Sequence, residues 1–127
     1  MAEHDFLLEE PQKIYNIKHR AFHFSKDVLM FVSEAKFEKV FYSIFDQLVR
    51  SATSIGANLV EATAGSSKKD FLNFYVIALK SANETKYWLC LIRDSIQSDK
   101  NKVSGLLQEA DELSKIIATI IISIKQG

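Results

Sequence analysis

The chain has 127 residues, which is enough for one domain with its own hydrophobic core. Its single Pro and four Gly are too few for a loop-rich all-β domain, because such domains need turn residues every few positions. The 16 Lys and Arg residues balance the 16 Asp and Glu residues, and this neutrality argues against a dedicated nucleic-acid-binding domain, which is usually basic.

An acidic segment opens the chain. The first ten residues contain four acidic side chains and no Lys or Arg, and Pro11 follows them. We therefore divide the chain into an acidic N-terminal tail, residues 1–11, and a bundle domain, residues 12–127. Without the tail the chain holds 16 basic and 12 acidic residues, which is compatible with a modest basic face.

Location and redox chemistry follow from what the sequence lacks. A single cysteine, Cys90, excludes an internal disulfide and a multi-cysteine zinc site, and we expect it to be a small buried hydrophobe. No basic segment followed by an apolar one marks a signal peptide. The longest apolar stretch, residues 116–124, is about half the length that a membrane span needs. We expect a cytoplasmic protein with no membrane partner.

The first predicted helix covers residues 12–32. Its apolar residues step by three and four and so share one face: Ile14, Ile17, Ala21, Phe24, Val28 and Phe31. Ser33 interrupts this pattern and is a candidate N-cap for the second helix.

The second predicted helix covers residues 34–63. Its apolar stripe comprises Phe41, Ile44, Leu48, Ala52, Ile55, Leu59 and Ala62. Gly56 lies within it, where glycine costs about 1 kcal/mol relative to alanine. Its presence indicates the close approach of a neighbouring helix or a local bend.

The third predicted helix, residues 68–97, follows a break at which Gly65 suits the left-handed position after a helix end. Ser67 and Asp70 have the spacing of a capping box. A polar loop, residues 98–102, leads to the fourth predicted helix, residues 103–125, whose apolar spacing suits near-parallel packing. Four long helices with short connections predict an all-α, antiparallel, up-down-up-down four-helix bundle.

A row of polar residues adjoins the apolar stripe of the second helix. Ser51, Ser54, Asn58 and Glu61 are spaced by three, four and three. One interpretation is a buried polar layer that fixes the register of the helices by hydrogen bonds; the other is a subunit interface or a central channel. The residues that we assign to this structural polar layer or oligomer interface are Arg50, Ser51, Ser54, Asn58, Glu61, Ser81 and Glu84.

Hairpin geometry makes the prediction more specific. If the turn centres near residues 65 and 66, facing residues have numbers that sum to about 132, which predicts an Arg50–Glu84 ion pair. Glu61 then lies near the start of the third helix, where its charge could satisfy free backbone N–H groups. Glu61 and Glu84 would be roughly 20 Å apart along the bundle, too far for a catalytic carboxylate pair.

Other chemistry has weak support. His19 and His23 lie four residues apart and could share a metal, but the sequence implies no third ligand, and we expect no metal or cofactor. No Gly-rich phosphate loop and no activated nucleophile is evident, so we expect no enzymatic activity. Four lysines on the third helix are either a solvated face or a strip that contacts nucleic acid: Lys68, Lys69, Lys80 and Lys86.

Several segments together resemble a known family. The runs Gln47–Asn58, Glu61–Ala62, Ser67–Phe71, Ile77–Lys80 and Glu84–Leu89 closely resemble the bacterial four-helix bundle proteins encoded within intervening sequences of 23S ribosomal RNA genes. The resemblance extends over residues 14–125 and is densest at residues 47–91. Gly56 and Ala62 stand where many members have Pro and Gly.

The resemblance implies a ring-shaped homopentamer without known enzymatic activity. A related branch, which is distinctly basic, comprises the accessory proteins of diversity-generating retroelements, and these bind RNA and a reverse transcriptase. We therefore expect a homo-oligomeric interaction scaffold, with an RNA-binding accessory factor as the alternative. The partners that we expect are other copies of the chain, and either RNA or a protein.

Overall fold

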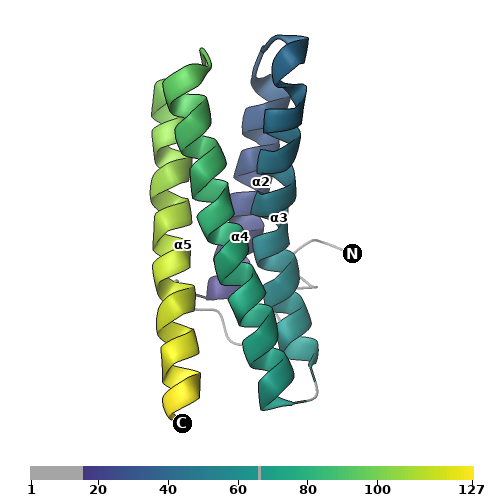
Figure 1. The fold of residues 1–127 in the computed structure, drawn as a ribbon, viewed down its shortest axis with the longest axis vertical. Helices are drawn as coiled ribbons and strands as arrows, with labels where there is room; N and C mark the ends of the chain where they lie inside the picture. Colours follow the sequence, from purple (N-terminus) through teal and green to yellow (C-terminus); the bar gives the residue numbers. More distant parts are fainter. Residues whose placement is uncertain (1–15, 66) are drawn as a thin grey trace.

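The computed structural model describes residues 16–65 and 67–127, and these residues form an antiparallel bundle of helices. The main elements are α2 (Ile17–Glu34), α3 (Tyr42–Ala64), α4 (Lys68–Ser95) and α5 (Lys100–Gln126). Each helix runs opposite to the one before it, and the start of α4 and the end of α5 reach beyond the start of α2 (Figure 1). The predicted all-α bundle is confirmed. The proposed acidic tail, residues 1–11, lies outside the described residues.

The connection between α2 and α3 differs from the prediction. Ser33 lies inside α2, where its hydroxyl donates to the Met30 carbonyl at 2.9 Å, so its assignment as an N-cap was wrong. A short 3-10 helix, η1 (Lys39–Phe41), precedes α3. The physical reason is aromatic packing: the extended connection lets the Phe37 ring stack on Phe45, with 3.7 Å between ring centroids.

The break between α3 and α4 follows the prediction only in part. Ser67 accepts a hydrogen bond from the backbone N–H of Asp70 at 3.0 Å, which confirms it as the N-cap of α4. Gly65, however, has φ −67° and ψ 152°, so the predicted left-handed conformation was wrong. Its N–H bonds to the Ala62 carbonyl at 3.2 Å, and this tight last turn ends α3 without a left-handed residue.

The start of α5 comes three residues earlier than predicted because of an N-cap that the sequence reading missed. The Asp99 carboxylate accepts hydrogen bonds from the backbone N–H groups of Asn101 and Lys102 at 3.1 and 3.2 Å. These two groups would otherwise lack partners at the helix N-terminus.

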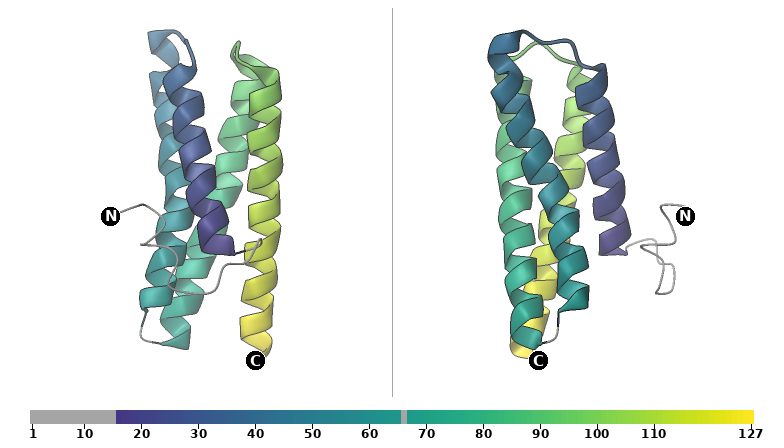
Figure 2. Two further views of the ribbon diagram at one scale, coloured as in Figure 1. Left: turned by 180° about the vertical axis from the view of Figure 1, so that it is seen from behind. Right: turned by 90° about the vertical axis from the view of Figure 1, so that its right-hand side faces the viewer.

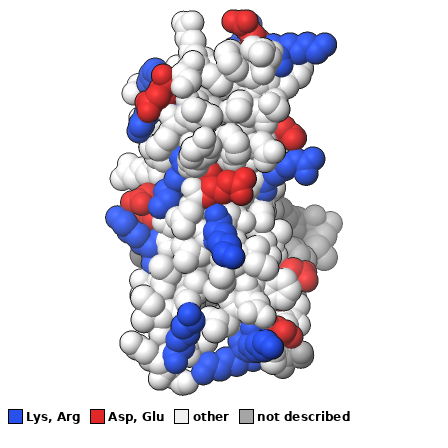
Figure 3. All heavy atoms as spheres, viewed as in Figure 1, with Lys and Arg blue, Asp and Glu red and all other residues white. Residues whose placement is uncertain are grey.

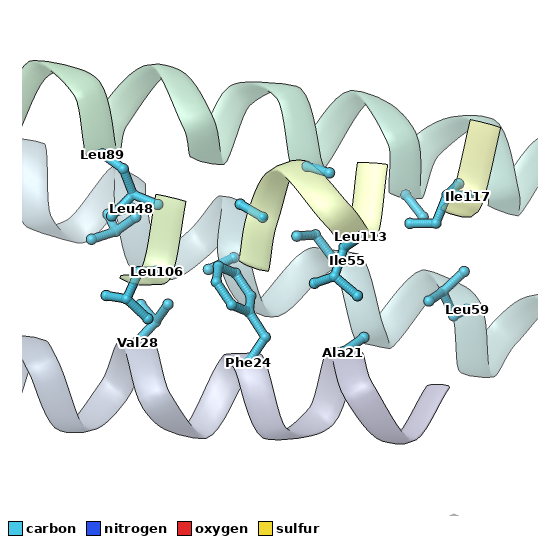
Figure 4. Packing of buried hydrophobic residues seen from close by; sticks show 14 of the residues in the cluster. Ala21, Phe24, Val28, Leu48, Ile55, Leu59, Leu89, Leu106, Leu113 and Ile117 are labelled. Atoms are coloured by element: carbon cyan, nitrogen blue, oxygen red, sulfur yellow. The ribbon is translucent and has the colours of Figure 1, made fainter. Parts of the chain in front are cut away.

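The core consists of the apolar stripes that the three- and four-residue spacing predicted. Side chains from all four helices meet along the bundle axis, as Figure 4 shows for Phe24, Leu48, Ile55, Leu89 and Leu113. Each of these is at most 1% exposed, so truncating one to alanine would cost about 2–5 kcal/mol. Cys90 is only half-buried and is not part of this core.

Gly56 lies where α2 and α3 come close together. A Cβ atom built on Gly56 would lie 3.5 Å from the Cβ of Ala21, and α3 is continuous through this position. Of the two interpretations of this glycine, the structure supports close approach. The contact is ordinary van der Waals distance, so the position has room for a methyl group.

The helices differ in length, and the last turns of α5 lie beyond the start of α2 (Figure 2). α2 has 18 residues and α5 has 27, or about 27 and 40 Å. Arg20, near the start of α2, binds Glu109 and Glu112 of α5. The remaining turns of α5 therefore extend past the start of α2, as Figure 2 shows. None of the helices in residues 16–65 and 67–127 has the length and hydropathy needed to cross a lipid bilayer.

Candidate functional site

Hydroxyl groups connect α3 and α4 in the middle of the bundle. Thr85 Oγ1 and Ser51 Oγ share a hydrogen bond at 3.0 Å, and both side chains are buried, with exposed fractions of 0% and 5%. Thr85 Oγ1 also lies 2.7 Å from the Ser81 carbonyl, one turn earlier in α4. Because all of these polar atoms have partners, the layer does not carry the penalty of a buried unpaired group.

A second pair lies one turn further along the same line. The Ser81 hydroxyl donates to Ser54 Oγ at 3.0 Å, and the Asn58 amide donates to Ser54 Oγ at 2.9 Å and to the Ser54 carbonyl at 2.8 Å. We name the five residues Ser51, Ser54, Asn58, Ser81 and Thr85 the polar seam. It is a layer of side-chain hydrogen bonds between two helices of one chain. A role for it in contact with a second chain stays a prediction.

The charged residues that we predicted beside these hydroxyls lie elsewhere, and the predicted Arg50–Glu84 ion pair was wrong. The Arg50 side chain is 73% exposed and binds Asp46, one turn earlier in α3, at 2.9 Å. This hydrogen bond raises the pKa of Arg50. Glu84 instead accepts a hydrogen bond from Trp88 Nε1 at 3.1 Å.

The physical reason for the error is the register of the hairpin. The facing pairs Ser54–Ser81 and Ser51–Thr85 have residue numbers that sum to 135 and 136, about one helical turn away from the predicted 132. Glu61 is exposed, and Ser67 rather than Glu61 accepts the hydrogen bond from the start of α4.

Sequence reasoning missed two other groups of contacts. It did not identify Thr85 as a member of the polar row, although a Thr on the buried side of α4 signals a hydroxyl that needs a partner. It also missed the link between α4 and α5, where Lys86 Nζ lies 3.3 Å from Asp111 Oδ1 and 3.0 Å from the hydroxyl of Ser114. Hydrogen bonds from Lys115 and then from Lys86 lower the pKa of Asp111.

The four lysines that we considered for nucleic-acid contact do not form one group. Lys86 is held by Asp111 and Ser114, and Lys68 Nζ donates to the carbonyl of Gly127 at 2.8 Å. Lys69 and Lys80 are exposed, and neither has an ion-pair partner within residues 16–65 and 67–127. They are eleven residues apart on α4, so they project from nearly the same side of the helix.

The histidines lie together near the start of α2. The ring centroids of His19 and His23 are 4.5 Å apart, and the rings meet edge to face. In the part of the chain that the structure describes, no three His, Cys, Asp or Glu side chains are arranged to hold a metal ion.

The side of the molecule between α2 and α5 carries ion pairs at both ends of a groove. At one end Arg20 binds Glu109 at 2.6 Å, and this hydrogen bond raises the pKa of Arg20. At the other end Lys102 binds Glu34 at 3.0 Å. A cavity of about 320 Å³ lies between them, lined by Asp27, Met30, Phe31, Glu34, Lys102, Gly105, Leu106 and Glu109. This groove combines apolar side chains with an excess of acids.

Comparison with known proteins gives the bundle a family. The model of the family described as 23S rRNA-intervening sequence protein matches residues 13–119, most of the chain. The chain belongs to this family. The resemblance that residues 47–91 carry most densely is thereby confirmed.

One solved structure supports the same assignment. It is the 1.70 Å crystal structure of a protein of unknown function from the S23 ribosomal protein family of Bacteroides thetaiotaomicron. The two sequences are 34% identical, the match covers 83% of this chain and 97% of that one, and the TM-score is 0.71. Among curated proteins none matches this intervening-sequence family member.

Proposed function

We propose that this intervening-sequence protein is a non-enzymatic homo-oligomer, a ring of five bundles, that serves as an interaction scaffold. The ring of five is what the family resemblance implies. The polar seam is consistent with a structural role, because its hydroxyl groups bond to one another and to helix carbonyls.

One observation carries the proposal: an apolar side of α5 extends beyond α2. Ile116 and Ile120 follow Glu112, which Arg20 of α2 binds, and both are only half-buried. Both side chains pack against the core with one part, and the part that stays exposed is apolar area that a partner can cover. Because leaving apolar area in water costs roughly 25 cal/mol per Å², a second copy that covers it would gain free energy.

Size-exclusion chromatography with light scattering tests self-association directly. A ring of five 14.4 kDa chains has a mass of about 72 kDa. We expect this mass at micromolar protein concentration, because an oligomer held by a large apolar interface dissociates only at lower concentrations. A mass of 14.4 kDa up to millimolar concentration would refute the proposal.

An RNA-binding accessory factor is the second candidate function. Its support is the pair Lys69 and Lys80, which are exposed and share one side of α4. A filter-binding titration with structured RNA at several salt concentrations tests this candidate. Phosphate contacts would make the affinity fall steeply with ionic strength, and Lys69→Gln with Lys80→Gln would reduce the slope by about one per lysine lost. Affinity that does not change with salt or with these substitutions excludes the candidate.

A further inference from the structure

The chain carries two surfaces of opposite charge on different sides of the bundle. The first is the groove side between α2 and α5, which we name the acidic face. It has four acids against two bases: Asp27, Glu34, Glu109 and Glu112, with Arg20 and Lys102. Its apolar residues are Met30, which is 56% exposed, and the half-buried Ile116 and Ile120.

The bases of the acidic face are already engaged by its own acids. Arg20 binds Glu109 and Glu112, and Lys102 binds Glu34. Asp27 is exposed and has no ion-pair partner among the described residues. The face therefore keeps an excess of negative charge beside exposed apolar side chains, and a cationic apolar partner would complement it.

The second surface is the outer side of α4, which we name the basic strip: Lys69, Val76, Lys80, Asn83 and Tyr87. Their spacing places them on one side of the helix, opposite the residues that α4 buries in the core. Tyr87 is 60% exposed and Val76 is half-buried. Two acids adjoin the strip along the helix, Asp70 after Lys69 and Glu84 after Asn83, and Glu84 accepts a hydrogen bond from Trp88. Figure 3 shows this side of the molecule, whose lower part carries mainly Lys and Arg.

The two surfaces also match in length. Lys69 and Tyr87 are eighteen residues apart on α4, and the acidic face extends over the same number of residues of α5, from Lys102 to Ile120. Both correspond to about 27 Å of helix. The acidic N-terminal tail is a poor alternative occupant of the acidic face, because its four acids would be repelled.

We infer that the basic strip on α4 of one copy docks against the acidic face of the next copy. This inference rests on the proposed self-association and assigns the two surfaces that produce it. Since a strip and a face on different sides of the bundle meet head to tail, the contact is heterologous and forms a ring when the rotation closes. Lys69 and Lys80 then pair with Asp27 and Glu112 of the neighbouring copy.

Charge reversal on either surface, and on both together, tests the inference. The strip variant is Lys69→Glu with Lys80→Glu, and the face variant is Asp27→Lys with Glu112→Lys. All four side chains are exposed, so the helical circular dichroism should stay close to that of the wild type. Because Glu112 binds Arg20 at 3.5 Å, the variants that carry Glu112→Lys should lose at most a few degrees in the thermal midpoint, and the other substitutions should leave it unchanged. The matched control for the strip variant is Lys36→Glu with Lys39→Glu. It makes the same charge change at two exposed lysines in the connection between α2 and α3.

We expect each reversal to raise the dissociation constant of the oligomer at least about tenfold, because like charges then face each other. In an equimolar mixture every contact between the two different variants brings opposite charges together, but a ring of five cannot alternate two kinds of chain and keeps at least one contact between identical copies. The fourfold variant, which restores opposite charges at every contact, should therefore be the one that assembles within about threefold of the wild type. The control should assemble like the wild type.

Three results would overturn the inference, and they separate it from the proposed function. A wild type that is monomeric refutes both. A wild type that assembles while both reversals leave the dissociation constant unchanged, or while the fourfold variant fails to recover, places the interface elsewhere and leaves self-association standing. Loss of RNA retention by the strip variant without any change in assembly would assign Lys69 and Lys80 to nucleic acid instead.

Discussion

The hydroxyl pair Ser51–Thr85 can be tested by a double-mutant cycle, which also separates the two interpretations of the polar row. Thr85→Val keeps the side-chain shape but removes the hydroxyl that lies 3.0 Å from Ser51 Oγ. Ser51 is 5% exposed and its remaining partner is the Leu48 carbonyl at 3.2 Å. We expect a loss of about 1–2 kcal/mol in the free energy of unfolding, the cost of weakening a buried hydrogen bond.

The double variant Ser51→Ala with Thr85→Val should cost less than the sum of the single variants, by about 1 kcal/mol, since no hydroxyl is then left with an incomplete set of partners. The measurement is urea unfolding followed by circular dichroism at one fixed protein concentration, because the stability of an oligomer depends on concentration. Thr53→Val is the matched control. Its hydroxyl bonds only within α3, to the carbonyls of Val49 and Arg50, so its cycle with Ser51→Ala should be additive.

Additive effects for Ser51 and Thr85 would refute the hydrogen-bonded layer. Unchanged unfolding of the subunit together with a changed oligomer mass would show that these hydroxyls meet a second chain. Either result would require a different hairpin register from the one that places Ser51 opposite Thr85.

Three further predictions concern a glycine, two arginines and an aspartate. Gly56→Ala should stabilise the fold by about 0.5–1 kcal/mol, because the new methyl group makes an ordinary contact and the helix propensity rises. The control is Gly105→Ala, whose Cβ meets nothing within 4 Å and which therefore gives the propensity effect alone. A loss of stability at Gly56 only would mean that α2 lies closer to α3 than the Gly56–Ala21 distance indicates. Arg20→Met should lower the thermal midpoint by a few degrees at low salt, since the variant loses a half-buried ion pair with Glu109. Arg50→Met, at a position that is 73% exposed, should leave the midpoint unchanged. The pKa of Asp111 in the folded protein is below its ordinary value. Its ion pairs therefore stabilise the fold above the unfolded pKa of about 4, and this stabilisation is lost as the pH falls through the folded pKa. Asp111→Asn should flatten the dependence of the free energy of unfolding on pH below about pH 4, and an unchanged dependence would contradict the pairing.

The sequence predicts the helices well because each carries an apolar stripe whose spacing only a helix can place on one side. It predicts their ends less well, since the end of a helix depends on single contacts. Asp99 and Ser33 are both ordinary N-cap residues by type, yet only Asp99 begins a helix. What decides against Ser33 is the stacking of Phe37 on Phe45, and no local pattern encodes that contact.

The candidate site was predicted in part of its composition and not in its pairing. The row of Ser51, Ser54 and Asn58 was identified because its spacing is local and helical. Its partners on α4 depend on the hairpin register. An error of about two residues in the assumed centre of the connection shifted the pairing by about one turn and exchanged Thr85 for Glu84 as the residue of interest. Long-range pairs inherit every such error, whereas periodicity within one helix does not.

The distribution of satisfied polar groups indicates where a partner can gain most from binding. Ser51 and Thr85 are buried and already bonded to each other, so a partner that competed for them would have to break one hydrogen bond for each that it formed. Asp27, Lys69 and Lys80 are exposed and lack ion-pair partners among the described residues. A partner that brings opposite charge to them loses no existing pair within the chain. If these charges select the neighbouring copy, the seam sets how α3 and α4 align, and that alignment fixes where the basic strip lies relative to the acidic face.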